Sequence, residues 1–156
     1  MKGILTVGTA VAIGLAAAPA WAGLGGALAF PDAQRTPATR LMAAVNAATV
    51  TWTVTTTMLE NDTVIHEYLD ASGTVFAVSW RGPRIGSLDA LLGRNYFPVW
   101  QKGLAVAQSA RRGGYGPVAM HQPDLVVETG GHMGALTGRA WLPKALPQGF
   151  NADLIQ

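Results

Sequence analysis

The sequence predicts a single α+β domain, in which one helical layer packs across an antiparallel sheet of five to six strands. Three observations support this class. Residues 50–80 have the pattern of three short strands, residues 88–107 carry a helical stripe of apolar side chains, and two or three strand-like segments follow and close in a C-terminal hairpin. Strands, then a helix, then strands is an order typical of an antiparallel sheet with a helix on one face.

The first strand covers residues 50–58. Val50, Trp52, Val54 and Met58 occupy even positions, and every odd position is threonine. Alternation with a period of two, together with β-branched side chains, indicates a strand with one buried face and one solvated face. We therefore expect the threonine face of this strand to be wet.

Residues 63–69 and 74–80 form the next two strands, joined by a turn at residues 70–73. Aspartate at the first turn position and glycine at the fourth favour a type I turn that closes with a glycine bulge. If Asp70 opposes Thr74, six side chains share one face of this hairpin: Tyr68 opposite Phe76, His66 opposite Val78, and Val64 opposite Trp80.

The helical stripe starts after Ser87, which we expect to cap the helix. Gly93 and Pro98 interrupt the stripe, so the sequence predicts a kink or two short helices. The run Arg-Arg-Gly-Gly at residues 111–114 should end the helix.

The remaining strands are expected at residues 118–121, 125–129 and 132–142. Gly130-Gly131 stands between the last two, and two glycines between strands favour a two-residue hairpin. This turn would place Glu128 opposite Met133.

Residues 1–22 have the pattern of an export signal. Lys2 precedes an uncharged stretch, and Ala20-Trp21-Ala22 supplies the small residues that signal peptidase recognises, so we expect cleavage after Ala22. A membrane anchor is the alternative, because residues 3–31 carry no charge. The cleaved protein would be periplasmic or extracellular, and would touch the membrane only through an uncleaved signal.

The mature chain divides into two parts. Residues 23–49 are expected to be irregular or short-helical, with a short helix over residues 37–47 that Pro37 could open. Residues 50–156 should form the single α+β domain.

Composition excludes several classes of protein. Charged residues make up 13% of the chain, against about 25% in a typical domain. The chain has no cysteine, which excludes disulfide scaffolds, thiolate metal sites and thiol nucleophiles. Loss of Lys2 leaves ten Lys and Arg (11 − 1) against nine Asp and Glu. No basic stripe stands out, so we expect no nucleic-acid partner.

Catalytic and metal-binding patterns are sparse. The chain lacks the Gly-x-Ser-x-Gly motif of a nucleophile elbow. His66 and Glu67 are consecutive on a strand and point to opposite faces. His121 with Asp124, or Glu128 with His132, could meet only across a turn. We therefore predict no catalytic residues, no metal site and no cofactor.

The leading functional hypothesis is a non-enzymatic module that binds a protein or another envelope component. Six residues form the expected partner surface: Trp80, Arg81, Gly130, Gly131, His132 and Arg139. One alternative is an envelope enzyme, or an inhibitor of one, that uses His132 or His66 near carboxylates. Another is a structural component that associates with itself through sheet edges.

Several phrases of the chain together resemble a known family. They are LGG at 24–26, VFAVSWRGP at 75–83, DLVVETGGHM at 124–133 and GRAWLP at 138–143. They are similar to a bacterial family of small exported proteins known only as a domain of unknown function, number twenty-eight forty-four. The likeness extends over essentially the whole mature chain, although the first strand is richer in threonine than expected. The resemblance implies a Gram-negative origin and export, and it supplies no activity and no catalytic residues.

Overall fold

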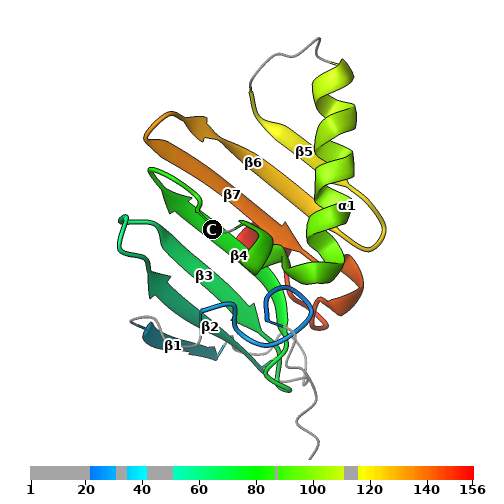
Figure 1. Ribbon diagram of the computed structural model, residues 1–156. Coiled ribbons are helices and arrows are strands. Elements are labelled where there is room, and N and C mark those ends of the chain that lie inside the picture. Colours follow the sequence, from blue (N-terminus) through cyan, green and yellow to red (C-terminus); the bar gives the residue numbers. More distant parts are fainter. Residues whose placement is uncertain (1–21, 31–34, 42–50, 87, 111–115) are drawn as a thin grey trace, which may run out of the picture.

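A computed structural model describes residues 22–30, 35–41, 51–86, 88–110 and 116–156. Within them, seven strands form one antiparallel sheet in the order β1-β2-β3-β4-β7-β6-β5 (Figure 1). The elements are β1 (Arg35–Leu41), β2 (Thr51–Met58), β3 (Val64–Leu69), β4 (Val75–Gly82), α1 (Leu88–Ala110), β5 (Val118–His121), β6 (Val126–His132) and β7 (Ala135–Trp141). The predicted α+β class, with an antiparallel sheet and one helical layer, is confirmed.

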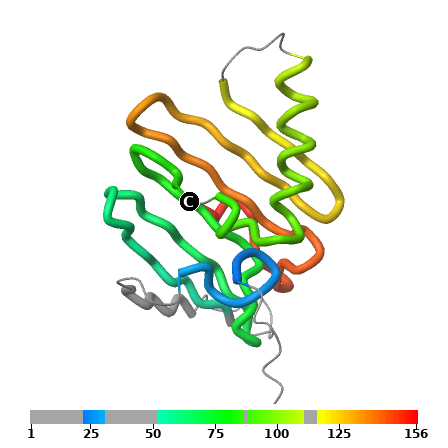
Figure 2. Tube along the Cα trace, viewed as in Figure 1, coloured from blue at the N-terminus to red at the C-terminus, as the bar shows by residue number. Residues whose placement is uncertain are grey.

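One face of the sheet is covered by α1 and by the N-terminal segment at residues 22–30 (Figures 1 and 2). Leu91 and Trp100 of α1 are buried there with Leu24, Trp80 and Val127. This cluster is the main hydrophobic core, and removal of its apolar surface from water is the principal source of stability.

The helix is kinked at Gly93, as predicted, where φ is 66° and ψ is 174°. The N-terminal segment packs against the kink. The carbonyl oxygen of Ala22 lies 3.0 Å from the position that a Cβ of residue 93 would take. The main-chain N–H of Leu24 donates to the carbonyl of Leu91 at 2.8 Å. Residues 22–30 are thus an integral part of the fold. Ser87 and the predicted stop at 111–114 lie outside the described residues.

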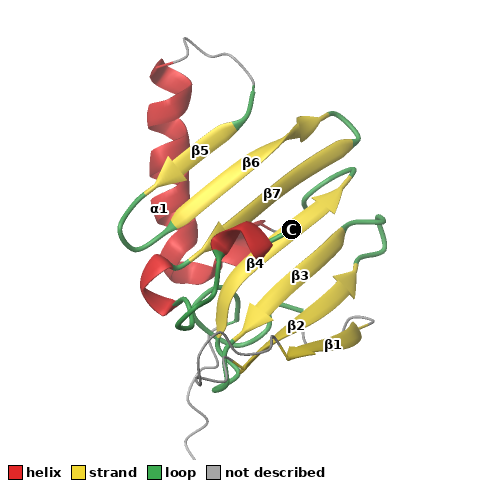
Figure 3. Cartoon of the chain, turned by 180° about the vertical axis from the view of Figure 1, so that it is seen from behind, coloured by secondary structure: helices red, strands yellow, loops and turns green. Residues whose placement is uncertain are grey.

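The opposite face is partly covered by the C-terminal segment, which includes the short helices η1 (Pro143–Ala145) and η2 (Ala152–Leu154) (Figure 3). Phe150 packs edge-on against Trp52 and Phe76, with ring centroids 5.2 and 4.9 Å apart. Ile155 is only 1% exposed and belongs to the same cluster. A second, smaller core therefore lies on this face.

The short helix expected over residues 37–47 is wrong where the structure can test it. Residues 35–41 form the edge strand β1, in which Pro37 lies opposite Thr55 of β2. An edge strand tolerates proline because one side of its main chain has no partner strand to bond. The rest of that expected helix, residues 42–47, lies outside the described residues.

The prediction that the threonine face of β2 is wet is also wrong. Thr55 and Thr57 are buried, at 7% and 0% exposure. Thr55 lies opposite Glu67 of β3, and the main-chain N–H of Ala29 donates to Glu67 Oε1 at 2.7 Å. The N-terminal segment therefore reaches over this face and covers it.

The predicted turn at residues 70–73 is confirmed, but the predicted register beyond it is wrong. The N–H of Asp70 donates to the carbonyl of Thr74 at 3.0 Å, and Gly73 has φ 81°. A bulge between Tyr68 and Leu69 then shifts the pairing by one residue, so Tyr68 lies opposite Ala77.

The shift moves side chains between faces. His66 lies opposite Ser79, Val64 opposite Arg81, and Trp80 opposite Ile65. Val78 and Trp80 consequently belong to the helix-side core, whereas Tyr68 and Phe76 remain together on the other face, with ring centroids 6.3 Å apart. A slip of one residue inverts every later side chain of a strand.

The C-terminal hairpin turns later than predicted. Gly130 and Gly131 lie within β6, and His132 pairs with Ala135, so Met133 and Gly134 form the two-residue loop. Glu128 therefore lies opposite Arg139 rather than Met133.

Candidate functional site

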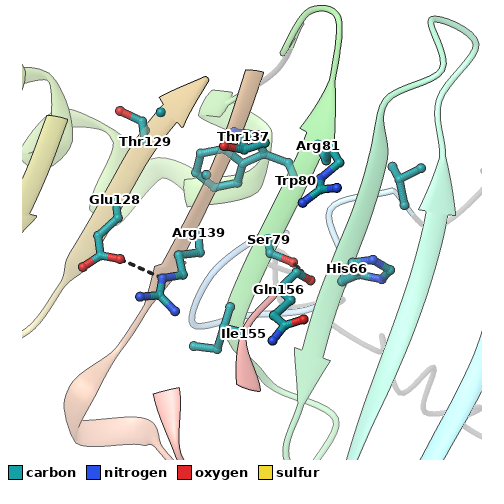
Figure 4. A pocket seen from close by; sticks show the side chains of 13 residues that line it. His66, Ser79, Trp80, Arg81, Glu128, Thr129, Thr137, Arg139, Ile155 and Gln156 are labelled. Carbon is teal, nitrogen blue, oxygen red and sulfur yellow. Dashed lines mark hydrogen bonds and ion pairs between the residues drawn. The ribbon is translucent and has the colours of Figure 1, made fainter. Parts of the chain in front are cut away.

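A row of polar side chains crosses the sheet on the face opposite α1. Glu128 on β6 pairs with Arg139 on β7, Arg139 with Ser79 on β4, and Ser79 with His66 on β3. Because register partners project from the same face, these four side chains form one line across four strands (Figure 4).

This row lies in a cavity of about 670 Å³, which we call the open-face groove. The next row of the sheet lines it too, with Gly130, Thr137 and Arg81 on β6, β7 and β4. One end is bounded by Ile155 and Gln156 of the C-terminal segment. The groove is large enough for a small ligand or a few residues of peptide.

Glu128 and Arg139 hold each other in place. Arg139 Nε donates to Glu128 Oε2 at 2.7 Å, and His121 Nε2 lies 3.0 Å from Glu128 Oε1. Arg139 also donates from Nη1 to the carbonyl of Ala152 at 3.3 Å, and its guanidinium lies 5.2 Å from the centroid of the Trp141 ring. Each oxygen of the carboxylate therefore has a partner within the protein.

Arg81 differs from Arg139 in its surroundings. Its side chain is exposed, and no carboxylate of the described residues lies within ion-pair distance of it. Among the side chains of the groove, Glu128 and Arg139 are paired with each other, and Arg81 is a further cation.

His66 is half-buried in the groove, and its Nδ1 lies 2.9 Å from Thr56 Oγ1. Burial lowers the pKa of His66 below its ordinary value, because desolvation penalises the charged ring. The ring is therefore neutral at pH 7, and contributes polar atoms but no charge.

The C-terminal segment is bound to this face through its main chain. Ser79 Oγ donates to the main-chain oxygen of Gln156 at 2.6 Å, and the N–H of Gln156 donates to Tyr68 Oη at 3.0 Å. Tyr68 Oη also donates to the carbonyl of Leu154 at 3.3 Å. Side chains of the sheet thus already bind a peptide backbone beside the groove.

The six residues of the partner surface expected from the sequence do not lie together in the structure. Arg81, Gly130 and Arg139 line the open-face groove. Gly131 and His132 line a neighbouring depression of about 700 Å³, in which His132 is exposed.

Trp80 also lines the groove, but its side chain is buried (Figure 4). It is 2% exposed, and its indole ring occupies the space where a Cβ at Gly138 would lie. The one-residue register shift is the reason, since it turns Trp80 toward α1.

The histidine pairings expected from the sequence also differ. His121 contacts Glu128 rather than Asp124, and His132 Nδ1 lies 3.0 Å from the carbonyl oxygen of Met133. Within the described ranges, no carboxylate bonds to His66 or His132, and no three His, Asp or Glu residues are grouped as metal ligands would be.

Ser79, Thr137 and Gln156 line the groove but were not singled out from the sequence. Alternation along β4 could have indicated Ser79, because it stands two residues before Arg81 and so shares its face. Nothing local to the sequence indicates that residues 152–156 return to this face.

A family comparison covers nearly all of the chain. The family described as Protein of unknown function (DUF2844) matches residues 20–155. The chain belongs to this family. The DUF2844 match begins just before the first described residue, Ala22, and includes both the N-terminal segment and the C-terminal segment.

No curated protein and no solved structure matches the chain.

In the part of the chain that the structure describes, no helix is long and apolar enough to cross a membrane.

Proposed function

We propose that this protein is an exported, non-enzymatic module that binds a protein of the cell envelope or a secreted protein through the open-face groove. The observation that carries the proposal is Arg81, an exposed cation without an acidic partner among the described residues, displayed on a sheet whose neighbouring groups are held by hydrogen bonds. A rigid element that displays an unsatisfied charge is suited to recognition.

Two further features support binding over catalysis. Two pairs of polar groups of the groove are already engaged, Glu128 with Arg139 and Ser79 with Gln156. A hydrolytic site would need a nucleophile bonded to a base that is itself oriented by a carboxylate. His66 instead bonds to Thr56.

Export is the second part of the proposal, and it is supported by the signal-like pattern of residues 1–22. Mass spectrometry of the protein from an envelope fraction or from the medium should find Gly23 at its N-terminus. Recovery of intact Met1 in the inner membrane would replace export with anchoring.

Site-specific photo-crosslinking in cells tests the binding surface. The full chain carries a photo-reactive amino acid at Thr137 in the groove or, as a control, at Gln101 on the exposed side of α1. We expect a protein adduct from position 137 that Arg81→Glu abolishes and Lys102→Glu, at an exposed helix position, leaves intact. Equal adducts from both positions, unaffected by Arg81→Glu, would overturn the proposal.

His132 belongs to the same proposal as a peripheral contact. Because its side chain is exposed and bonds only to the neighbouring carbonyl of Met133, His132→Ala should change the free energy of unfolding by less than about 0.5 kcal/mol. The yield of the adduct from position 137 should fall nevertheless. If His132→Ala unfolds the domain, the residue is structural and its role in recognition is refuted.

A further inference from the structure

We infer that the peptide bond between Ala22 and Gly23 is open to hydrolysis only before the N-terminal segment packs on the domain, so that removal of the signal and folding of this segment follow a fixed order. This inference rests on the export part of the proposed function, which places the cleavage at this bond. Three observations carry it: the burial of the bond, the conformation of Gly23, and the contacts that hold the residues after it.

Both sides of the bond are engaged in the folded domain. The N–H of Gly23 donates to the carbonyl of Ala27 at 2.7 Å. The carbonyl oxygen of Ala22 lies 3.0 Å from the position that a Cβ of Gly93 would take, at the kink of α1. Gly23 is buried, and a Cβ on it would overlap the carbonyl oxygen of Ala90. A peptidase therefore has no room on the Gly23 side of the bond while the segment is in place.

The main chain after the bond also has the wrong conformation for a peptidase, which binds its substrate as an extended chain. Extended main chain has φ of about −120°, whereas φ is 96° at Gly23 and 81° at Gly25. The N–H of Gly26 donates to the carbonyl of Gly23 at 2.9 Å and closes a turn directly after the bond. The segment must leave this turn before cleavage, so cleavage proceeds from an opened state.

Several contacts hold the segment closed. Leu24 is 4% exposed and belongs to the main core. The N–H of Gly25 donates to the carbonyl of Val75, at the start of β4, at 2.8 Å. The N–H of Ala29 donates to Glu67 Oε1 on β3 at 2.7 Å. Opening that frees the bond breaks these contacts, so the opened state is a minor population of the folded domain.

The hydrolysis itself leaves a chain that still fits this fold. One water molecule is consumed, the C–N bond between Ala22 and Gly23 breaks, and the products are a carboxylate on Ala22 and an ammonium on Gly23. The nitrogen of Gly23 can still donate to the carbonyl of Ala27, and the contacts of Leu24, Gly25 and Ala29 do not involve the residues removed. A chain that folds first keeps its signal. The order of the two events thus decides between release and anchoring.

Cleavage of the folded precursor by purified bacterial signal peptidase tests this inference. The substrate is the full chain, residues 1–156, in detergent solution, and circular dichroism verifies that it is folded. The reference substrate is a synthetic peptide of residues 1–30, which carries the same cleavage sequence without the sheet. Mass spectrometry measures the initial rate at which the product that begins at Gly23 appears.

Two variants of the full chain loosen the segment at positions distant from the bond. Gly93→Ala places a methyl group against the carbonyl oxygen of Ala22, and Ala29→Pro removes the N–H that donates to Glu67. Gly134→Ala is the matched control for Gly93→Ala, because φ at Gly134 is also positive, at 85°, but its surroundings are open. If Gly93→Ala does not fold, Ala29→Pro carries the comparison.

We expect the folded chain to be cleaved at least about tenfold more slowly than the peptide, because the rate follows the population of the opened state. The loosened variants Gly93→Ala and Ala29→Pro should each be cleaved at least about threefold faster than the unaltered chain, and Gly134→Ala within about twofold of it.

Equal rates for the folded chain and the peptide would overturn the inference, as would a rate that neither loosened variant raises. The two proposals fail separately. If the peptide and the folded chain are cut equally fast after Ala22, export stands and only the fixed order fails. If neither substrate is cut at this bond, the export part of the proposed function fails, and the inference fails with it.

Discussion

Three glycines near the tip of the β6–β7 hairpin should respond very differently to alanine. Gly131 has φ 99°, and an added Cβ would overlap the carbonyl oxygen of Ala135 and lie 3.0 Å from Leu136 Cα. Gly134 has φ 85° but open space around it. Gly130 has neither a positive φ nor a close neighbour.

These differences give an expected order of destabilisation. A side chain at positive φ costs about 1–2 kcal/mol, and overlap with main chain that cannot move aside adds about 1–3 kcal/mol. Gly131→Ala should therefore cost about 2–5 kcal/mol and Gly134→Ala about 1–2 kcal/mol. Gly130→Ala should stay within about 0.5 kcal/mol of the unaltered protein.

Thermal unfolding followed by circular dichroism, together with urea unfolding followed by tryptophan fluorescence, measures all three variants. At about 4 °C per kcal/mol for a domain of this size, Gly131→Ala should lower Tm by about 8–20 °C. If Gly130→Ala destabilises as much as Gly131→Ala while Gly134→Ala is neutral, the turn lies at residues 130–131 and the register described above is wrong.

Three further changes test other parts of the structure. Glu128→Gln should lower the free energy of unfolding, measured in urea, by less than about 1 kcal/mol, because its partners are partly exposed. Partial burial raises the pKa of Asp70, but hydrogen bonds from Ser72 and Thr74 lower it below its ordinary value overall. The stability that its charge contributes is therefore present above the ordinary pKa and lost as pH falls through the folded pKa. The difference in the free energy of unfolding between Asp70→Asn and the unaltered protein, measured in urea, should accordingly be largest near about pH 6 and shrink as the pH is lowered. Phe150→Ala should cost about 2–4 kcal/mol in thermal unfolding, because this ring joins the C-terminal segment to the sheet.

The spacing of apolar residues predicted those strands and helices whose pattern lies within the element itself. The alternation along β2, the stripe along α1 and the kink at Gly93 could all be inferred from residues within one element. The strand β1 could not, because residues 35–41 have no alternation of apolar and polar side chains, and their extended form depends on pairing with β2. Tertiary context overrides a weak local preference in such segments.

The burial of the threonines in β2 could not be predicted from the sequence for a similar reason. The alternation of the strand is real, since Trp52 and Thr55 lie on opposite faces, but both faces are covered. Residues 22–30 cover one face and residues 146–155 the other. Both covering segments are irregular and distant in sequence, so no pattern within β2 indicates them.

The candidate site shows why some of its residues were predictable although their contacts were not. The last turn was predicted at Gly130-Gly131 and lies at Met133-Gly134, which moves the partner of Glu128 from Met133 to Arg139, six residues later in the chain. Six is even, so every side chain keeps its face, and Gly130 and Arg139 lie on the same face of the sheet with either turn. In the first hairpin the bulge shifted the register by one residue, an odd number, and Trp80 passed from the expected surface into the core. A register error of an even number of residues therefore leaves each side chain on its predicted face. An error of an odd number moves the side chains of one strand to the opposite face. The alanine variants of Gly130, Gly131 and Gly134 test this shift of six residues directly. They locate the turn from backbone conformation, and so distinguish two registers that place the side chains on the same faces.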